Sequence, residues 1–199
     1  MFSGIILQHA KIEELKNNGV GRHFVLNVPM ASHRQIERGC SVALNGACFT
    51  VIKKAMRTFE VEAMPQTLRI TTVGEWQKGD LLNFEPSLKM GDEIGGHLMF
   101  GHVDQVGEVN RCLCEGTATV MCFLAPDDVM KMITTRGSVA IDGVSLTVMS
   151  RKEKSFRVSL LPETLKATTL GKLKARDKVN IEIDMLARYA YEYIQNSQR

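Results

Sequence analysis

One motif occurs twice in this chain, in two similar versions: SVALNGACFTV at residues 41–51 and SVAIDGVSLTV at residues 138–148. A second pair follows at the same distance, PQTLRITTVG at residues 65–74 and PETLKATTLG at residues 162–171. Both pairs are separated by 97 residues, and no gap is needed to align them. Self-similarity of this length at one offset indicates an internal duplication rather than chance.

Within each copy, the pattern of apolar residues favours short strands. Asn45-Gly46 and Asp142-Gly143 are hairpin turn signals, because these residue types tolerate a positive φ. Residues 59–62 alternate with period two, as residues 83–85 do. Short strands with glycine punctuation about every 8–12 residues are typical of a small antiparallel barrel. The sequence therefore predicts a mostly β fold.

Three segments carry helical signals. Residues 126–133 open with a proline and two acids, as helix starts often do, and we expect a counterpart near residues 31–38. In residues 185–194 the apolar side chains recur four apart and form one stripe. An amphipathic helix at this place needs a surface to cover, either its own barrel or a neighbouring subunit.

The duplication predicts the division of the 199 residues into domains. A copy of this size is long enough to bury its own core. We expect an N-terminal barrel at residues 1–90, a C-terminal barrel at residues 91–185, and a C-terminal helix for oligomerisation at residues 186–199.

Composition and charge exclude several classes of protein. The chain is 44% hydrophobic and 24% charged, which rules out a disordered chain. The formal net charge is +3 and aromatic residues make up 6%, which disfavours a nucleic-acid partner. No stretch approaches the roughly 20 apolar residues of a membrane span, and residues 1–11 lack the pattern of a signal peptide. We expect no membrane partner and a cytoplasmic location.

The five cysteines are an odd number and form no even disulfide framework, so we expect reduced thiols. Cys112, Cys114 and Cys122 can also be interpreted as metal ligands, but a fourth ligand at zinc spacing is absent. His97 and His102 are five residues apart, which is a poor metal spacing. We therefore expect no metal.

The most informative positions are those where the two copies differ. Four such pairs separate candidate nucleophiles and acid–base groups: Cys48 and Ser145, Ile5 and His102, Asn45 and Asp142, and Gln66 and Glu163. A matching scaffold with unequal reactive groups is what a reaction between two similar molecules requires. One pocket would hold the molecule that loses a proton, and the other would hold the molecule that is attacked.

Five motifs resemble the riboflavin synthase family of the alpha-chain type, which is built from two lumazine-binding repeats: MFSGII at 1–6, NGACFTV at 45–51, GGHLMFGHVD at 95–104, DGVSLTV at 142–148 and PETL at 162–165. The resemblance implies two six-stranded barrels, a homotrimer joined through the C-terminal helices, and no metal or separate cofactor. The implied reaction is the dismutation of two molecules of 6,7-dimethyl-8-ribityllumazine. One molecule gives a four-carbon unit to the other, which yields riboflavin and 5-amino-6-ribitylamino-uracil.

The resemblance also implies the site residues. A first half-site would use Gly4, Ile5, Ile6, Cys48, Phe49, Thr50, Glu62, Ala63, Met64, Pro65, Gln66 and Thr67. A second half-site would use Gly101, His102, Val103, Arg136, Ser145, Leu146, Thr147, Ser159, Leu160, Leu161, Pro162, Glu163 and Thr164. We expect Glu62 and Ser159 to bind the ribityl hydroxyls.

The candidate catalytic residues are Cys48 and His102, with Ser41 and Asp184 as supporting groups. A histidine can transfer protons near neutral pH, and a thiolate can add reversibly to an electron-poor ring. In the family's trimer the first barrel of one chain faces the second barrel of its neighbour, so Cys48 and His102 need not meet within one chain.

The sequence departs from the family pattern at three positions. Ser3 replaces a threonine and keeps the hydroxyl, Phe49 stands where leucine is common, and Arg136 stands where lysine is usual. An arginine keeps the charge of a lysine but changes its hydrogen-bond geometry.

Three other functions compete with the synthase. A non-catalytic lumazine-binding or flavin-binding protein shares the doubled barrel, but its second copy has usually lost the pocket motif, which is present here. A flavin reductase would need a nucleotide-binding domain with a glycine-rich phosphate loop. A pair of oligonucleotide-binding barrels is disfavoured by the near-neutral charge and the few aromatic residues.

Overall fold

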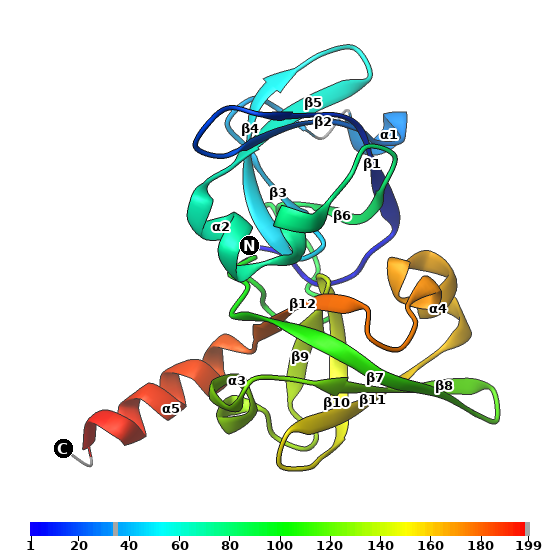
Figure 1. Cartoon of the computed structure of the whole chain (residues 1–199), viewed down its shortest axis with the longest axis vertical. Coiled ribbons are helices and arrows are strands. Elements are labelled where there is room, and N and C mark those ends of the chain that lie inside the picture. Colours follow the sequence, from blue (N-terminus) through cyan, green and yellow to red (C-terminus); the bar gives the residue numbers. More distant parts are fainter. Residues whose placement is uncertain (34–35, 198–199) are drawn as a thin grey trace.

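The computed structural model describes residues 1–33 and 36–197, and it shows two closed barrels, one above the other (Figure 1). The first barrel has the strand order β1-β2-β5-β4-β3-β6. Its strands are β1 Gln8–Asn17, β2 Arg22–Asn27, β3 Ser41–Leu44, β4 Ala47–Lys54, β5 Thr58–Ala63 and β6 Leu81–Pro86. All the strand pairs of this barrel are antiparallel.

The second barrel repeats this circular order, with β7 to β12 in the places of β1 to β6. Its strands are β7 Gln105–Glu115, β8 Ala118–Leu124, β9 Ser138–Ile141, β10 Val144–Arg151, β11 Ser155–Leu160 and β12 Lys178–Ile183. The predicted fold of two six-stranded antiparallel barrels followed by a helix is confirmed.

The predicted helices are found, and two pairs of short helices were not predicted. The segment at 126–133 forms α3 Asp127–Met132 and the tail forms α5 Met185–Ser197. The expected counterpart near 31–38 is helical only in α1 Met30–His33, because residues 36–38 are not helical and residues 34–35 lie outside the described residues. The unpredicted elements are α2 Pro65–Ile70, η1 Thr72–Glu75, α4 Pro162–Ala167 and η2 Thr169–Lys172. None of the helices in the described part of the chain is long and apolar enough to cross a membrane.

The two predicted hairpin turns form as expected and also join the barrels. Asn45 and Gly46 have φ values of 42° and 78°, and Asp142 and Gly143 have values of 45° and 78°. Two consecutive positive φ values match the twist of the flanking strands. The turn tips touch, because a Cβ built on Gly46 would lie 2.7 Å from the backbone nitrogen of Gly143.

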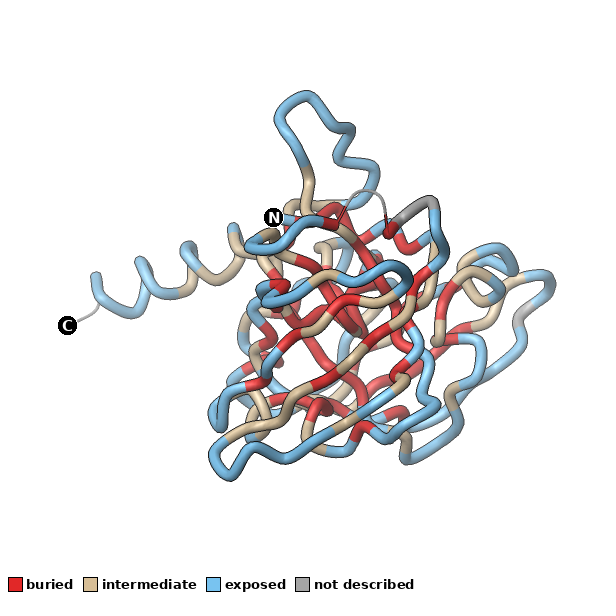
Figure 2. Tube along the Cα trace, turned by 90° about the horizontal axis from the view of Figure 1, so that it is seen from above, coloured by how far each residue is buried: buried red, intermediate tan, exposed pale blue. Residues whose placement is uncertain are grey.

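Each barrel encloses its own apolar core. Buried residues fill the body of the molecule, whereas its loops and most of the C-terminal helix are exposed (Figure 2). Phe24 and Phe59 belong to the first core, and Phe156 belongs to the second. Two residues are exceptions to this division. Ile6 packs into the second core, although it precedes β1, and Val103 packs into the first core, although it precedes β7.

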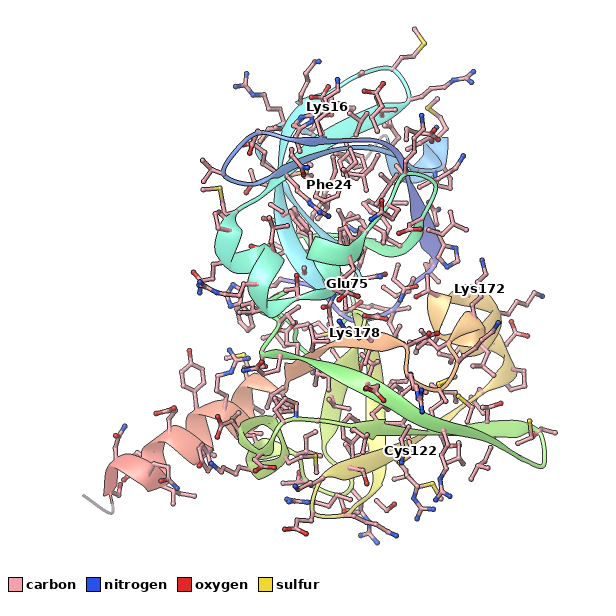
Figure 3. The ribbon with its side chains drawn as sticks, in the orientation of Figure 1. Lys16, Phe24, Glu75, Cys122, Lys172 and Lys178 are labelled. Atoms are coloured by element: carbon pink, nitrogen blue, oxygen red, sulfur yellow. The ribbon has the colours of Figure 1, made fainter. Side chains whose placement is uncertain are left out.

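A pseudo-twofold arrangement relates the barrels. The backbone nitrogen of Phe2 donates to the oxygen of Met99 at 2.8 Å, and that of Met99 donates to the oxygen of Phe2 at 3.0 Å. The side-chain amide of Asn83 donates to the Asp142 carbonyl at 2.8 Å, and that of Asn180 donates to the Asn45 carbonyl at the same distance. Glu75 and Lys178 form an ion pair across the barrels (Figure 3).

Candidate active site

Two crossing segments, residues 2–6 and 99–103, build the candidate site. Each segment leads into one barrel and lies against the other. The backbone nitrogen of Cys48 donates to the carbonyl of Gly101 at 2.9 Å, and the backbone nitrogen of Ser145 donates to the carbonyl of Gly4 at 2.9 Å. We refer to the place where the first barrel meets residues 101–103 as the first pocket, and to the equivalent place where the second barrel meets residues 4–6 as the second pocket.

These contacts differ from the half-sites that we expected from the sequence. We expected residues 4–6 beside Cys48 and residues 101–103 beside Ser145, whereas the carbonyl contacts pair Gly101 with Cys48 and Gly4 with Ser145. Ile5 also lines a hollow of about 530 Å³ together with Ser41 and Glu85 of the first barrel. The error has a physical source. Sequence position assigns a segment to the strand that follows it, whereas the carbonyls of Gly4 and Gly101 accept hydrogen bonds from the other barrel.

Glycine is required where each segment passes over its partner strand. Gly4 and Gly101 have φ values of +75° and +74°, in the left-handed region that favours glycine. A Cβ built on Gly101 would lie 2.6 Å from the Cβ of Cys48, and one built on Gly4 would lie 2.6 Å from the Cβ of Ser145. The absent side chains let the backbone approach the reactive positions directly.

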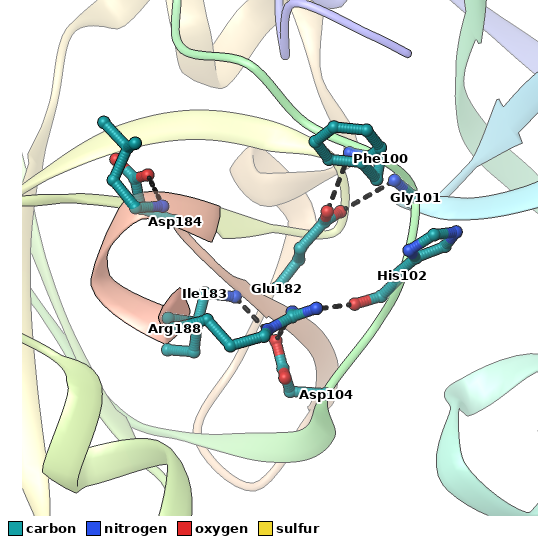
Figure 4. Close-up of polar contacts among 9 residues, drawn as sticks. Phe100, Gly101, His102, Asp104, Glu182, Ile183, Asp184 and Arg188 are labelled. Carbon is teal, nitrogen blue, oxygen red and sulfur yellow. Dashed lines mark hydrogen bonds and ion pairs between the residues drawn. The ribbon is translucent and has the colours of Figure 1, made fainter. Parts of the chain in front are cut away.

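Two buried carboxylates hold the segments in place. Glu182 accepts hydrogen bonds from the backbone nitrogens of Phe100 at 2.8 Å and Gly101 at 3.0 Å (Figure 4). Glu85 accepts from the backbone nitrogens of Ser3 at 2.7 Å and Gly4 at 3.0 Å. Burial raises the pKa of both carboxyls, and these N–H donors oppose the rise by stabilising the charged form.

The first pocket is a cavity of about 390 Å³ beside α2, and it brings several predicted residues together in one chain. Seven of its lining residues were predicted: Cys48, Met64, Gln66, Thr67, Gly101, His102 and Val103. Sequence reasoning missed three others, Ala47, Ile70 and Thr71. Their signal was available, because Ala47 adjoins Cys48 in the repeated motif and the other two lie in the repeated stretch that begins at Pro65.

Cys48 is half-buried in this pocket, and its thiol is held in the protonated form. Burial raises the pKa of the thiol, and Glu182 adds to the rise, whereas a hydrogen bond from Ser41 and the charge of the N-terminal amine oppose it. The thiolate is the reactive nucleophile of a cysteine. A protonated thiol is instead suited to donate a weak hydrogen bond or to pack against a ring.

The side chain of His102 is exposed at the mouth of the first pocket, where its ring lies 5.8 Å from that of Phe100. Its carbonyl lies 3.5 Å from the Arg188 side chain, and the same guanidinium pairs with Asp104 at 2.7 Å (Figure 4). Asp184 accepts from the backbone nitrogen of Leu186 at 2.9 Å at the start of α5. Asp184 therefore has a structural contact in addition to the supporting catalytic role that was predicted.

The second pocket carries the equivalent groups. Ser145 lies under Gly4 as Cys48 lies under Gly101, and α4 repeats α2. Arg136, on the loop before β9, is exposed and has a φ of +70°. The described residues thus place a polar hydroxyl in the second pocket where the first pocket has a thiol.

The remaining predicted residues fall into three groups. Glu62 and Ser159 are exposed, and Glu62 accepts a hydrogen bond from the Asn18 side chain at 2.7 Å. Other predicted residues with exposed side chains are Ile5, Thr50, Pro65, Thr147, Leu161, Pro162 and Glu163, and Thr164 is half-buried. The side chains of Ile6, Phe49, Ala63, Leu146 and Leu160 are buried, so these residues can offer a surface ligand mainly their backbone.

A larger hollow, of about 630 Å³, lies between the barrels near Asn45 and Asp142, and it is lined by none of the predicted site residues. Among residues 1–33 and 36–197, no group of three or more histidine, cysteine, aspartate or glutamate side chains is arranged to hold a metal ion.

The doubled barrel and its two pockets define the class of protein. The model of the lumazine binding domain matches residues 3–87 and again residues 100–184, so the chain carries two such domains in tandem. A riboflavin synthase of Brucella abortus (strain 2308) is 45% identical over 203 residues, which cover 98% of each chain. A riboflavin synthase of Escherichia coli (strain K12) is 41% identical over 185 residues, covering 92% of this chain and 87% of the relative. The chain belongs to the riboflavin synthase family.

Solved structures show the same fold at low sequence identity. The crystal structure of LumP complexed with riboflavin has a TM-score of 0.85 and 22% identity, covering 92% of this chain and 99% of LumP. LumP complexed with 6,7-dimethyl-8-(1'-D-ribityl) lumazine has a TM-score of 0.83 and 21% identity, covering 92% of this chain and 98% of LumP.

Proposed function

We propose that this protein catalyses the dismutation of two molecules of 6,7-dimethyl-8-ribityllumazine into riboflavin and 5-amino-6-ribitylamino-uracil. It acts as a transferase, because a four-carbon unit passes from one substrate molecule to the other. The single observation that carries this proposal is that the same crossing contact is made at both barrels. Gly101 faces Cys48 in one and Gly4 faces Ser145 in the other, within a chain that aligns over nearly its whole length with riboflavin synthases.

The chain's groups suit this chemistry. Loss of a proton from the C7 methyl of one ring leaves a delocalised anion, which fixed hydrogen-bond donors stabilise. The exposed hydroxyls of Thr50 and Thr147 and the backbone groups of the crossing segments supply such contacts at each barrel. Holding two rings in a fixed orientation can contribute on the order of 7–11 kcal/mol to catalysis.

His102 and Cys48 are the proposed acid–base pair of the first pocket, with Ser41 beside the thiol. The exposed imidazole of His102 can exchange protons with water, while the protonated Cys48 thiol can donate to a developing anion. Asp184 would support the site through α5. Glu62 and Ser159, exposed on β5 and β11, would bind the ribityl hydroxyls.

The proposed reaction requires two substrate rings in contact. We propose that the two rings are held by pockets of neighbouring chains. The helix α5 projects from the second barrel and exposes one apolar face, on which Leu186, Tyr189 and Tyr193 are 73%, 66% and 75% exposed (Figure 2). We propose a homotrimer in which α5 joins the chains and the first pocket of one chain faces the second pocket of the next. The domains proposed for this assembly are residues 1–90, residues 91–185 and the helix at 186–199.

The alternative function is a non-catalytic lumazine-binding or flavin-binding protein, and the LumP complexes give it a specific basis. The test is to add 6,7-dimethyl-8-ribityllumazine to the purified protein and to follow riboflavin by absorbance. The proposal expects riboflavin and the uracil product in equal amounts. Tight binding of the lumazine with no riboflavin formed would establish the binder instead.

Substitutions separate the roles of the two candidate catalytic residues. Cys48→Ser and His102→Gln should each lower kcat, with Cys114→Ser as a matched control because Cys114 is exposed on β7. Full turnover in both of the first two variants would remove their chemical roles and leave binding and orientation as the source of catalysis.

We also propose a cytoplasmic location. The five cysteines are all free, and reduced thiols are the rule in the cytosol. Fractionation of cells that express the tagged protein tests this assignment, and recovery outside the cytosolic fraction contradicts it.

A further inference from the structure

His97 lies beside Ser145 and has no part in the function described so far. Its Nδ1 atom is 2.6 Å from the hydroxyl oxygen of Ser145. Its Nε2 atom is buried and has no hydrogen-bond partner within the described residues. The described residues thus give the imidazole one hydrogen-bonding partner, the hydroxyl of Ser145.

The backbone is shaped to bring this histidine to Ser145. A Cβ built on Gly96 would lie 2.2 Å from the Ser3 carbonyl oxygen and 2.7 Å from the Ser145 hydroxyl oxygen, so only glycine fits there. On its other side, the Ser145 backbone nitrogen is bonded to the Gly4 carbonyl. The serine is thus enclosed by two glycines and the imidazole, which restricts the orientation of its hydroxyl.

The first pocket has a different pair at the equivalent place. Cys48 takes the place of Ser145, and the side-chain partner of its thiol is Ser41. The histidine–serine pair therefore distinguishes the second pocket from the first. Because the two substrate molecules have different fates, a group present in only one pocket is a candidate for distinguishing them.

The protonation of His97 follows from its surroundings. Burial lowers the pKa of the imidazole, and the Asp184 carboxylate at the start of α5 opposes this effect. The carboxylate of Glu85 accepts hydrogen bonds from the backbone nitrogens of Ser3 and Gly4. The ring is therefore neutral at pH 7 and carries one N–H. A buried lone pair without a partner is tolerated better than a buried N–H without one, which places the proton on Nδ1.

We propose that His97 is a positioning residue for Ser145, and that it donates from Nδ1 to the Ser145 hydroxyl oxygen. This bond leaves the hydroxyl proton of Ser145 free to donate to the ring bound in the second pocket. Ser145 is then a fixed donor toward the negative charge that develops on that ring. The inference rests on the proposed synthase function and assigns an asymmetric role to the second pocket.

A double-mutant cycle tests the coupling between the two residues. His97→Phe and Ser145→Ala should each lower kcat by roughly 10- to 100-fold, and the double variant should be no slower than Ser145→Ala. His97→Asn restores an N–H donor near the Nδ1 position, so it should recover most of the lost kcat. Independent, multiplicative losses in the double variant would overturn the proposal, as would a His97→Asn variant as slow as His97→Phe at equal melting temperature.

A second measurement does not depend on turnover. In the full chain labelled with ¹⁵N-histidine, the imidazole spectrum should show neutral His97 protonated on Nδ1, and this signal should shift in Ser145→Ala. Protonation on Nε2 would refute the assigned direction of the bond. Wild-type protein that forms no riboflavin would remove the proposed function, while the imidazole spectrum still decides the His97–Ser145 bond.

Discussion

The positions of Gly4 and Gly101 require glycine for two separate reasons, a left-handed backbone and the lack of space for a side chain. Sequence comparison of the two copies aligns Gly4 with Gly101, but only the three-dimensional contacts show that each covers a reactive position of the other barrel. The two glycines therefore let the backbone pass directly above Cys48 and Ser145. A substitution that adds a side chain at either glycine tests this requirement.

Gly101→Ala should damage the first pocket. The left-handed φ costs about 1–2 kcal/mol for alanine, and the new methyl would clash with the Cβ of Cys48. We expect a lower melting temperature and a raised KM for the lumazine. Gly39→Ala is the control, since Gly39 has a φ of +88° and the methyl group of an alanine there would meet nothing within 4 Å, so it should lose only the backbone contribution. Equal effects of the two substitutions would contradict this account.

Asp142 replaces the Asn45 of the first copy at a buried turn, and this difference predicts a pH dependence of stability. Burial raises the pKa of Asp142 to about 7, and the backbone N–H of Asn180 partly opposes the rise. The folded state therefore binds this proton more tightly than the unfolded state does. The stabilisation is full below the unfolded pKa near 4 and is lost as the pH rises through about 7.

Asp142→Asn should consequently stabilise the protein at pH 8 by on the order of 4 kcal/mol and change little at pH 4. An asparagine can keep the bond from the Asn180 nitrogen, as Asn45 does with Asn83. The free energy of unfolding in denaturant at the two pH values measures this. The reciprocal variant Asn45→Asp should lose stability at pH 8 only. A pH-independent effect of Asp142→Asn would show that the carboxyl titrates normally.

At the scale of elements, α5 has an apolar face that the described residues of its own chain leave exposed. Its packing against the second barrel is limited to its first turns, where Ala187 contacts the core and Arg188 pairs with Asp104. An exposed apolar stripe on a helix that projects from the molecule is typical of an interface. The proposed trimer depends on this face.

Tyr193→Glu should therefore dissociate the assembly, because a charge buried in an apolar interface is costly. Gln195→Glu is the matched control, since Gln195 lies on the opposite face of the same helix and its substitution introduces the same charge. Light scattering after size-exclusion chromatography measures the mass of each variant. Turnover should fall with the mass for Tyr193→Glu alone. An assembly that survives this substitution would locate the interface elsewhere.

At the scale of the whole molecule, neither barrel has a complete pocket of its own, because residues 4–6 contribute to the second pocket and residues 101–103 contribute to the first. Residues 1–90 lack residues 101–103, which cover Cys48. Residues 4–6 of a second copy are equivalent to these residues by the pseudo-twofold relation, and the Phe2–Met99 pairing has the geometry of an antiparallel bridge.

We predict that a chain cut after residue 90 forms a dimer in which the segments exchange between copies. This dimer should bind the lumazine, yet turn over slowly because it lacks the Ser145 pocket. Sedimentation and fluorescence titration measure the two properties. A monomer that binds the lumazine as tightly as the full chain would show that the crossing segment contributes nothing to the pocket.

Much of this architecture could be predicted from residue order. The repeated motif, the Asn45-Gly46 and Asp142-Gly143 turns and the apolar stripe of α5 depend on local backbone preferences and on periodicity, which neighbouring residues specify. For the same reason Cys48 and His102 could be singled out from their motifs. The proline-led helices α2 and α4 were missed because each is a six-residue segment, too short for a helical period to be visible.

The allocation of residues 4–6 and 101–103 to pockets could not be read from their neighbours in the chain. Each segment precedes the strands of one barrel and donates to a carboxylate of that barrel, yet its glycine carbonyl accepts from the other barrel. That second contact joins groups more than 40 residues apart, such as the Gly101 carbonyl and the Cys48 nitrogen. The same holds for His97, which meets Ser145 across 48 residues. Local sequence specifies which strands form, whereas long-range hydrogen bonding and packing between the barrels determine which side chains share a site.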